Sequence, residues 1–244
     1  MHAPAPAPTR DSTEPGPRWE FDAEVAACFD DMLRRSIPDH DRMRALVHAV
    51  GRTFVRPATD VVDLGCSRGE AIDAFYREFG ATARYVLCDV SAPMLDAARA
   101  RFRGAIENRI VDVREYDLRQ PYPPLRASLT LCVLTLQFTP IEHRHRILRD
   151  IYGSTRPGGA MILVEKILGS TAEADALLVD LHHAEKQARG YSRESVDRKR
   201  LSLQNVLIPV TGRWNEELLA AAGFRHVECF WRSLNFAGWV AVRE

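Results

Sequence analysis

The chain has 244 residues, enough for one α/β domain with an elaboration or for two small domains. Its 33 basic and 33 acidic residues give a formal net charge of zero, so no general positive field attracts a nucleic-acid backbone. No apolar run approaches the ~20 residues of a membrane span, and the five cysteines show no metal-ligand spacing. These features favour a cytoplasmic protein with reduced thiols and count against direct binding to nucleic acid, membrane or metal.

Residues 1–17 are rich in proline and lack the apolar core of a signal peptide. We expect them to form a disordered tail that buries nothing, followed by a single domain over residues 18–244. Apolar positions recur at helical spacing in residues 23–35 and 43–50. This pattern predicts two amphipathic helices within residues 18–56, ahead of the core.

A buried strand, a glycine turn and a helix are predicted over residues 61–75. Gly65 and Gly69 let the backbone approach a ligand closely, and the new helix points its free amides at the same place. Ser67 in the middle of the turn excludes the three-glycine dinucleotide fingerprint. An ordinary strand-to-helix connection is the alternative. If the turn cradles a nucleotide-like ligand, the contacting residues are Asp63, Gly65, Cys66 and Ser67.

The next predicted strand, residues 84–89, ends on an acid. A carboxylate about 20 residues after such a glycine turn commonly accepts hydrogen bonds from ribose hydroxyls. We therefore expect Asp89, with its neighbour Val90, to contact a ribose. Capping of the following helix is the alternative role, because Ser91 and Pro93 also suit a helix start.

Three further strands are predicted before residue 167. Residues 109–113 form a short strand that includes Asp112, residues 129–134 form a nearly all-apolar central strand, and residues 161–166 follow a Pro-Gly-Gly turn. Four strand–helix repeats in a row favour an α/β fold with one mostly parallel, doubly wound sheet.

Residues 167–210 do not continue this alternation of strands and helices, and they carry apolar residues at helical spacing. An insertion here would cover the carboxyl ends of the strands, where open α/β sheets bind ligands, so we expect a helical lid. A short helix over residues 215–222 and two strands, 225–234 and 236–242, then predict a C-terminal antiparallel hairpin.

The turn Asp63-Leu64-Gly65-Cys66-Ser67-Arg68-Gly69 and the later Pro157-Gly158-Gly159 turn resemble motifs of the class I S-adenosyl-L-methionine (SAM) methyltransferases. The resemblance implies a Rossmann-like fold and SAM as cofactor or substrate. In that pattern Asp112 would accept a hydrogen bond from the exocyclic amine of adenine, and the backbone amide of Val113 would meet a ring nitrogen. A plain turn role for Asp112 is the alternative.

Other stretches resemble a narrower family, the carboxy-SAM synthases. They are Trp19–Asp22, Asp31–Pro38, Leu134–Phe138, Ile151–Lys166 and the lid from His182 through Tyr191 to Arg200 and Val206. Members of that family use prephenate to convert the SAM methyl group into a carboxymethyl group, releasing phenylpyruvate, and a separate tRNA enzyme uses the product. The resemblance assigns Arg200 to the new carboxylate, which a guanidinium can hold bidentately. A surface arginine is the alternative.

Three positions depart from the family's pattern. His40 replaces a ligand-binding tyrosine, Val90 an asparagine after the ribose acid, and Val133 an asparagine that helps to bind the modified cofactor. Two lost amides make the site drier and less suited to an extra carboxylate.

The departures keep a second hypothesis open, in which the enzyme uses plain SAM. It would transfer the methyl group to a small molecule, or cyclise SAM to azetidine-2-carboxylate and methylthioadenosine, with Tyr191 steadying the sulfonium. A non-catalytic SAM-binding protein is the third reading. The second substrate is prephenate or another metabolite, and a homodimer is one option for the assembly. Candidates for a general base are His40, His182, His183 and Tyr191.

Overall fold

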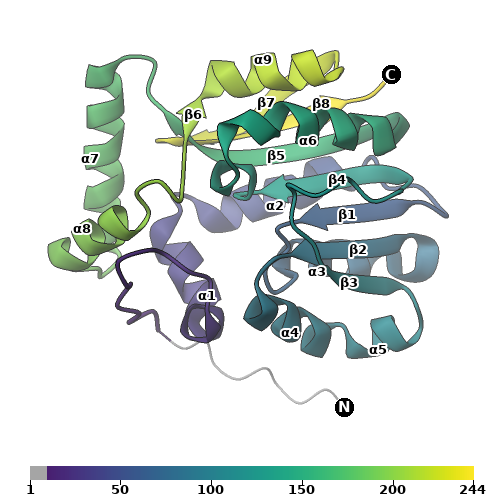
Figure 1. Cartoon of the computed structure of the whole chain (residues 1–244), viewed down its shortest axis with the longest axis horizontal. Coiled ribbons are helices and arrows are strands. Elements are labelled where there is room, and N and C mark those ends of the chain that lie inside the picture. Colours follow the sequence, from purple (N-terminus) through teal and green to yellow (C-terminus); the bar gives the residue numbers. More distant parts are fainter. Residues whose placement is uncertain (1–9) are drawn as a thin grey trace.

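The structure is a computed structural model that describes residues 10–244 (Figure 1). Seven strands form one sheet in the order β3-β2-β1-β4-β5-β8-β7, and a short strand, β6 (Val210–Thr211), pairs with β5. The strands of the sheet are β1 (Asp60–Leu64), β2 (Arg84–Asp89), β3 (Val111–Glu115), β4 (Ala127–Val133), β5 (Thr155–Leu168), β7 (His226–Ser233) and β8 (Phe236–Val242). β1 to β5 pair in parallel, whereas β8 pairs antiparallel with β5 and β7. The predicted mostly parallel sheet and its C-terminal hairpin are confirmed.

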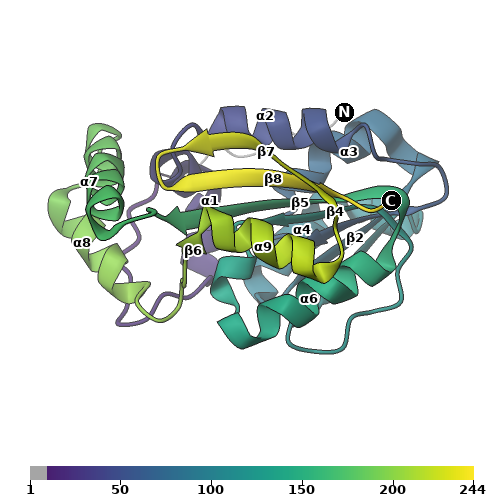
Figure 2. The ribbon, with the colours of Figure 1, turned by 90° about the horizontal axis from the view of Figure 1, so that it is seen from above.

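Helices cover both faces of the sheet because alternate residues of the central strands point to opposite sides. Val61 and Leu131 join one apolar cluster, with residues of α2, α3 and α4, while Val62 and Cys132 join the other, with α6 and α9. Figure 2 shows α2 and α3 on one face and α6 and α9 on the other. The helices are α1 (Ala23–Ser36), α2 (His40–Gly51), α3 (Glu70–Phe79), α4 (Ala92–Arg101), α5 (Arg103–Glu107), α6 (Ile141–Ser154), α7 (Ala172–Ala188), α8 (Arg193–Ser202) and α9 (Gly212–Ala222).

Side chains at the helix starts explain several of these bounds. Asp22 accepts a hydrogen bond from Val25 N at the start of α1, and Ser91 accepts one from Met94 N at the start of α4. Each bond satisfies an amide that the first helical turn leaves free. Ser91 is thus a helix cap, and this leaves the neighbouring Asp89 available for a ligand.

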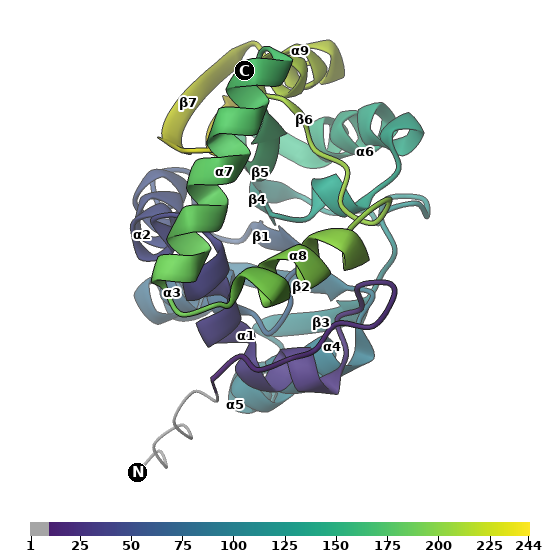
Figure 3. The same cartoon turned by 90° about the vertical axis from the view of Figure 1, so that its left-hand side faces the viewer.

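The carboxyl ends of the parallel strands meet at one edge, where α1, α7 and α8 lie (Figure 3). Both lid helices fall within residues 167–210, where the helical lid is predicted. Over residues 10–244, no helix is both long and apolar enough to span a membrane.

Part of the predicted tail is packed against the domain. Asp11 has 7% of its surface exposed and its backbone N donates to Asp31 Oδ2 of α1 at 2.8 Å. The expectation that residues 1–17 bury nothing is therefore wrong at Asp11, because tertiary partners supply what the local sequence lacks. Residues 1–9 lie outside the described residues, and a disordered tail there stays a prediction.

Candidate active site

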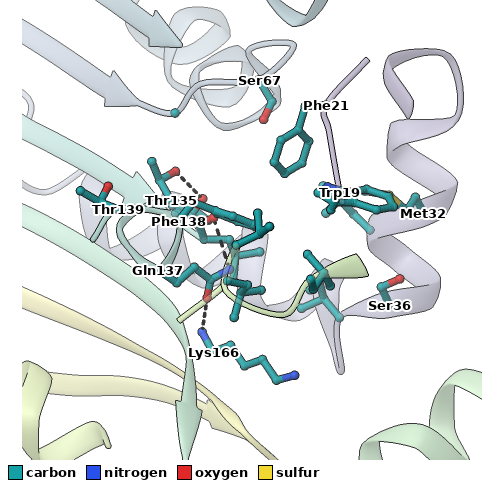
Figure 4. A pocket seen from close by; sticks show the side chains of 18 of the residues that line it. Trp19, Phe21, Met32, Ser36, Ser67, Thr135, Gln137, Phe138, Thr139 and Lys166 are labelled. Carbon is teal, nitrogen blue, oxygen red and sulfur yellow. Dashed lines mark hydrogen bonds between the residues drawn. The ribbon is translucent and has the colours of Figure 1, made fainter. Parts of the chain in front are cut away.

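A cavity of about 680 Å³ lies at the carboxyl ends of the parallel strands, within the size range of small-molecule sites. The glycine turn, α1 and the lid all contribute to it. Figure 4 shows Ser67 of the turn, aromatic residues near α1, and Gln137 and Lys166 around the same space. Phe21 and Phe138 meet edge to face at 5.3 Å between ring centroids and form part of its apolar wall.

The predicted glycine turn lines this cavity with all four expected residues, Asp63, Gly65, Cys66 and Ser67. The Asp63 carboxyl group is buried, and its Oδ2 has no hydrogen-bond partner among the described residues. Burial raises the pKa of Asp63 to about 7, although the nearby Arg44 opposes this shift. An unpartnered buried carboxyl oxygen at a cavity fits a cationic ligand group such as an ammonium.

Position 65 requires a glycine for two reasons, its backbone conformation and the lack of space for a side chain. Its φ is +72°, a left-handed value, and a Cβ at this position would collide with the side chain of Thr135. We expect Gly65→Ala to destabilise the fold by roughly 3 kcal/mol and to weaken ligand binding. Chemical denaturation checks this, with Gly153→Ala as the matched control, since a Cβ on Gly153 has nothing within 4 Å. Equal stability of the two variants would contradict the assignment.

Asp89 is held in place by backbone amides at the end of β2. Ser67 N donates to its Oδ2 at 2.8 Å and Ser91 N to its Oδ1 at 2.9 Å. Burial raises the pKa of Asp89, whereas these amide bonds favour the charged form. Asp89 and Val90 both line the cavity, as predicted. The fixed carboxylate retains lone pairs that can accept from ribose hydroxyls.

The prediction that Asp112 and Val113 contact adenine is wrong in this structure. Neither lines the cavity, and the Asp112 carboxylate instead accepts from Arg114 Nε at 2.9 Å. β3 extends to Glu115, which lies opposite Asp89, so Asp112 sits three positions before the strand end, about 10 Å away. The predicted strand ended too early because the polar residues after Val113 do not look like a buried strand.

Asp117 and Leu118, which follow β3, line the cavity and were missed by the sequence interpretation. Arg119 Nε lies 2.9 Å and 3.0 Å from the two Asp117 carboxylate oxygens, and this bonding lowers the pKa of Asp117. The acid is therefore ionised at neutral pH. Its position beyond the end of β3 is the one that the resemblance had assigned to Asp112.

Val133 and His40, two of the departures from the family's pattern, also line the cavity. His40 Nδ1 lies 3.2 Å from Asp41 Oδ1, and its buried Nε2 has no partner among residues 10–244. Burial lowers the pKa of His40, so the ring is neutral at pH 7.

Basic side chains form the lid side of the cavity. They are Lys166, Lys186, Lys199 and Arg200, a set that we call the cationic wall. His183 lines the same side, but burial lowers its pKa and it is a neutral imidazole at pH 7. Lys186 is 8% exposed, and in the described part of the chain no carboxylate lies within 4.0 Å of its Nζ. Burial, with repulsion from Lys199 and Lys166, lowers its pKa to about 7. A buried ammonium among like charges favours a bound anion, which would repay its lost hydration.

Arg200 occupies the rim of this wall. Its side chain is 51% exposed, and its Nε lies 4.0 Å from Asp197 Oδ1, too far for a strong hydrogen bond. The guanidinium therefore keeps its donors for another partner, as the resemblance requires.

Tyr191 does not line the cavity, which corrects the expectation that it faces a bound sulfonium. Its hydroxyl group donates to Asp11 Oδ2, and the Arg35 guanidinium lies 3.9 Å from its ring centroid. Tyr191 thus links the lid to the N-terminal segment, a role that depends on a contact 180 residues apart in sequence.

His182 is fixed in one neutral form. Its Nε2 lies 2.7 Å from the carbonyl oxygen of Ser36, and since a carbonyl only accepts, Nε2 carries the proton. Burial lowers the pKa of His182 to about 3, and its Nδ1 is a buried acceptor with no partner in residues 10–244. Of the four candidates for a general base, the cavity brings together His40, His182 and His183.

The residues at the strand ends fit SAM as a bound group. Asp63 offers an orphaned carboxyl oxygen to an ammonium, Gly65 a close backbone approach, Asp89 acceptors to a ribose, and Asp117 an acceptor to an adenine amine.

Comparisons with known proteins agree with this fit. A family model described as "Methyltransferase domain" matches residues 61–159. Carboxy-S-adenosyl-L-methionine synthases from Erwinia tasmaniensis and Methylococcus capsulatus are each 34% identical to this chain. Those alignments cover 92% and 91% of the chain, and 92% and 93% of the relatives.

Solved structures share the fold. Human N-acetylserotonin methyltransferase in complex with SAM matches 91% of the chain with a TM-score of 0.58 at 15% identity, and the chain spans 55% of its length. An O-methyltransferase family protein from Burkholderia thailandensis matches 91% with a TM-score of 0.63 at 19% identity, and the chain spans 60% of it. The chain is therefore a SAM-utilising transferase that belongs to the class I SAM-methyltransferase superfamily and, within it, to the carboxy-SAM synthase family.

Proposed function

We propose that this enzyme carboxylates the methyl group of SAM, taking the carboxyl group from prephenate and releasing phenylpyruvate. The observation that carries the proposal is the cationic wall, which faces the same cavity as the SAM-binding turn. An acceptor of a simple methyl group needs no such concentration of buried positive charge, whereas a donor with two carboxylates would be held by it.

In this reaction the chain's main task is to hold two charged substrates. Asp63 pairs with the ammonium of SAM, and Asp89 and Asp117 fix its ribose and adenine. Lys186 and Lys199 receive carboxylate groups of the donor. The sulfonium makes the adjacent methyl group slightly acidic, and a neutral imidazole passes one of its protons to the hydroxide that prephenate expels, so that water leaves. The C–C bond to one carboxyl group of prephenate breaks in the same step, which releases CO2 and phenylpyruvate, and the deprotonated methyl carbon forms a new bond to that CO2. Arg200 then holds the new carboxylate bidentately.

The acid–base part of the reaction falls to groups that are neutral at pH 7. His40 and His182 each present an imidazole whose pKa is lowered by burial, so each has a free lone pair. His40 begins α2, and His182 bonds to the carbonyl oxygen of Ser36 at the end of α1. Either can accept a hydrogen bond from a substrate hydroxyl group without adding charge to the cationic wall.

Val133 favours a second candidate function, the use of plain SAM. It lines the cavity at the end of β4 and offers no hydrogen bond to an added carboxylate. Such an enzyme would methylate a small anionic molecule, or form azetidine-2-carboxylate and methylthioadenosine from SAM alone. In the cyclisation the cationic wall would hold the carboxylate of SAM itself.

Mass spectrometry of the purified protein incubated with SAM, with and without prephenate, tests the proposal. We expect carboxy-SAM and phenylpyruvate in equal amounts, and only when prephenate is present. Methylthioadenosine formed from SAM alone would instead establish the cyclase. S-adenosylhomocysteine formed only after a third compound is added would establish methyl transfer, and either result would overturn the carboxylation.

A further inference from the structure

Residues 10–14 lie against the lid and α1, and we call them the N-terminal strap. Figure 3 shows this part of the chain running beside α8 before it enters α1. The strap contacts α1 through a hydrogen bond of the buried Asp11 and α8 through an exposed ion pair of Glu14, which contributes little to stability. Asp11 N donates to Asp31 Oδ2 on α1 at 2.8 Å, and Glu14 Oε2 lies 3.1 Å from Arg198 Nη1 on α8.

The Asp11 carboxylate is buried at the centre of the strap, and each of its oxygens has a partner. Oδ2 accepts from the Tyr191 hydroxyl group and lies 3.8 Å from Lys199 Nζ, while Oδ1 accepts from Thr13 N at 3.1 Å. A buried carboxylate would cost several kcal/mol without such partners. Two of these partners, Tyr191 and Lys199, belong to the lid, so the strap and lid are mutually dependent.

Arg35 of α1 completes the connection. Its Nη1 donates to the Asp11 carbonyl oxygen at 3.0 Å and its Nε to the Arg189 carbonyl oxygen at 2.9 Å. The same guanidinium stacks on the Tyr191 ring. The strap, α1 and the turn between α7 and α8 therefore meet at one cluster, which lies behind the cavity, since neither Asp11 nor Tyr191 lines it.

Lys199 connects this cluster to the cavity, because its side chain contacts Asp11 on one side and lines the cavity on the other. The groups that face it are Asp11 from the strap, Cys28 and Arg35 from α1, Lys186 from α7, and the Trp19 ring, which lies 4.4 Å from its Nζ. Asp11 is the carboxylate in this set. It offsets the repulsion from Lys186 and Arg35.

We propose that Asp11 is a positioning residue, which acts through Lys199 and Tyr191 to hold α8 against α1 and to keep a charged ammonium in the cationic wall. That this ammonium serves an anionic second substrate rests on the proposed function. The role of Asp11 in holding α8 against α1 does not depend on the proposed function. The strap thus gives the N-terminal segment, which carries no SAM-binding motif, an indirect role in the geometry and charge of the cavity.

Burial lowers the pKa of Lys199 to about 8, and Asp11 opposes this shift. Without the Asp11 charge the pKa of Lys199 would fall further, so at neutral pH a larger share of Lys199 would be uncharged. As the pH rises, the affinity of the cationic wall for an anion would then begin to fall at a lower pH than in the wild type.

The test compares Asp11→Asn with Glu14→Gln in the full-length protein. Glu14 belongs to the same strap and its side chain is 78% exposed, so Glu14→Gln is the matched control. Hydrogen exchange is measured first, because it needs no second substrate. We expect Asp11→Asn to speed amide exchange over residues 191–202 by about tenfold or more, and Glu14→Gln to leave it near wild type.

Tyr191→Phe provides a second variant that removes the same hydrogen bond from the lid side and leaves the strap sequence intact. It should reproduce the faster exchange of Asp11→Asn. If both variants exchange like Glu14→Gln, Asp11 does not position the lid and the proposal is overturned, whatever reaction the enzyme performs.

Steady-state kinetics with prephenate then tests whether the Asp11 carboxylate keeps Lys199 charged. We expect Asp11→Asn to raise the KM for prephenate by about threefold at pH 7.5, with kcat and the Kd for SAM within about twofold of wild type. The rise in KM with pH should begin about one pH unit lower than in Glu14→Gln. Identical pH profiles of KM in the two variants would contradict the charge role. Failure of the wild type to use prephenate would refute the proposed function and leave the exchange result standing.

Discussion

Replacing Asp89 with Asn is expected to weaken SAM binding by about 100-fold, because ribose hydroxyls donate to a charged carboxylate and each such bond contributes roughly 1.5–3 kcal/mol. The isosteric amide retains one acceptor oxygen and points its NH₂ group at a donor. Two backbone amides hold the carboxylate at 2.8 Å and 2.9 Å, so the side chain is already oriented before SAM binds. Isothermal titration calorimetry with freshly purified protein measures the effect.

Asp112→Asn is the matched control for Asp89→Asn. Asp112 is also a strand acid of the predicted site, but its carboxylate bonds to Arg114 away from the cavity. We expect its Kd for SAM to stay within about twofold of wild type. The corresponding change at Asp117, Asp117→Asn, should weaken binding by about tenfold through one lost adenine contact. Weaker binding for Asp112→Asn than for Asp117→Asn would show that the cavity has been assigned to the wrong residues.

Replacing Lys186 with Met is expected to separate function from stability. Under the proposed reaction, the variant should raise the KM for prephenate by about 100-fold, because a buried charge-assisted bond to a carboxylate is lost, while the Kd for SAM changes little. Initial rates measured over a range of prephenate concentrations check this. Arg193→Met is the control, since Arg193 is an exposed cation of the lid that does not line the cavity.

The same substitution should stabilise the unliganded protein. Burial lowers the pKa of Lys186 to about 7 in the folded state, below its ordinary value of 10.5. The unfolded chain therefore binds more protons between these two pH values, and the penalty for burying the ammonium is fully present below pH 7 and disappears as the pH rises toward 10.5. We expect Lys186→Met to raise the Tm by several degrees at pH 6.5 and by less at pH 9. A lower Tm at pH 6.5 would show that Lys186 has an anionic partner within the protein.

Binding of the anionic substrate should weaken with rising pH for the same reason. A protonated Lys186 attracts a carboxylate and a neutral one does not, so the wild-type KM for prephenate should increase above about pH 7. Lys186→Met should show a flatter profile. The comparison uses the same assays and needs no further variant.

Local sequence patterns were sufficient to predict the sheet and the glycine turn that lines the cavity. The strand over residues 84–89 and the hairpin were predicted at nearly their observed bounds, because alternating or continuous apolar residues signal burial directly. The glycine turn was predicted where the structure has it, since backbone conformation at Gly65 and Gly69 is set by adjacent residues, and the ligand contacts of the turn stay a prediction.

The errors occurred where a residue's role depends on distant partners. β3 carries polar residues toward its end, so its length is set by pairing with β2, and the adenine contact was predicted at Asp112, which does not line the cavity, whereas Asp117 does. Tyr191 was assigned to the ligand because aromatic residues stabilise cations, yet the cations near its ring belong to the protein itself, with the Arg35 guanidinium nearest among the described residues.

By itself, the sequence determined the order of strands and helices, the glycine turn at the cavity and the membership in a family, because these depend on local periodicity and on motifs read along the chain. The tertiary structure alone decided which charges gather around the cavity. Asp11, Lys186 and Lys199 are separated by up to 188 positions, and only folding brings them together. Electrostatic energy depends on distance in space and on burial, and neither quantity is written in the local sequence.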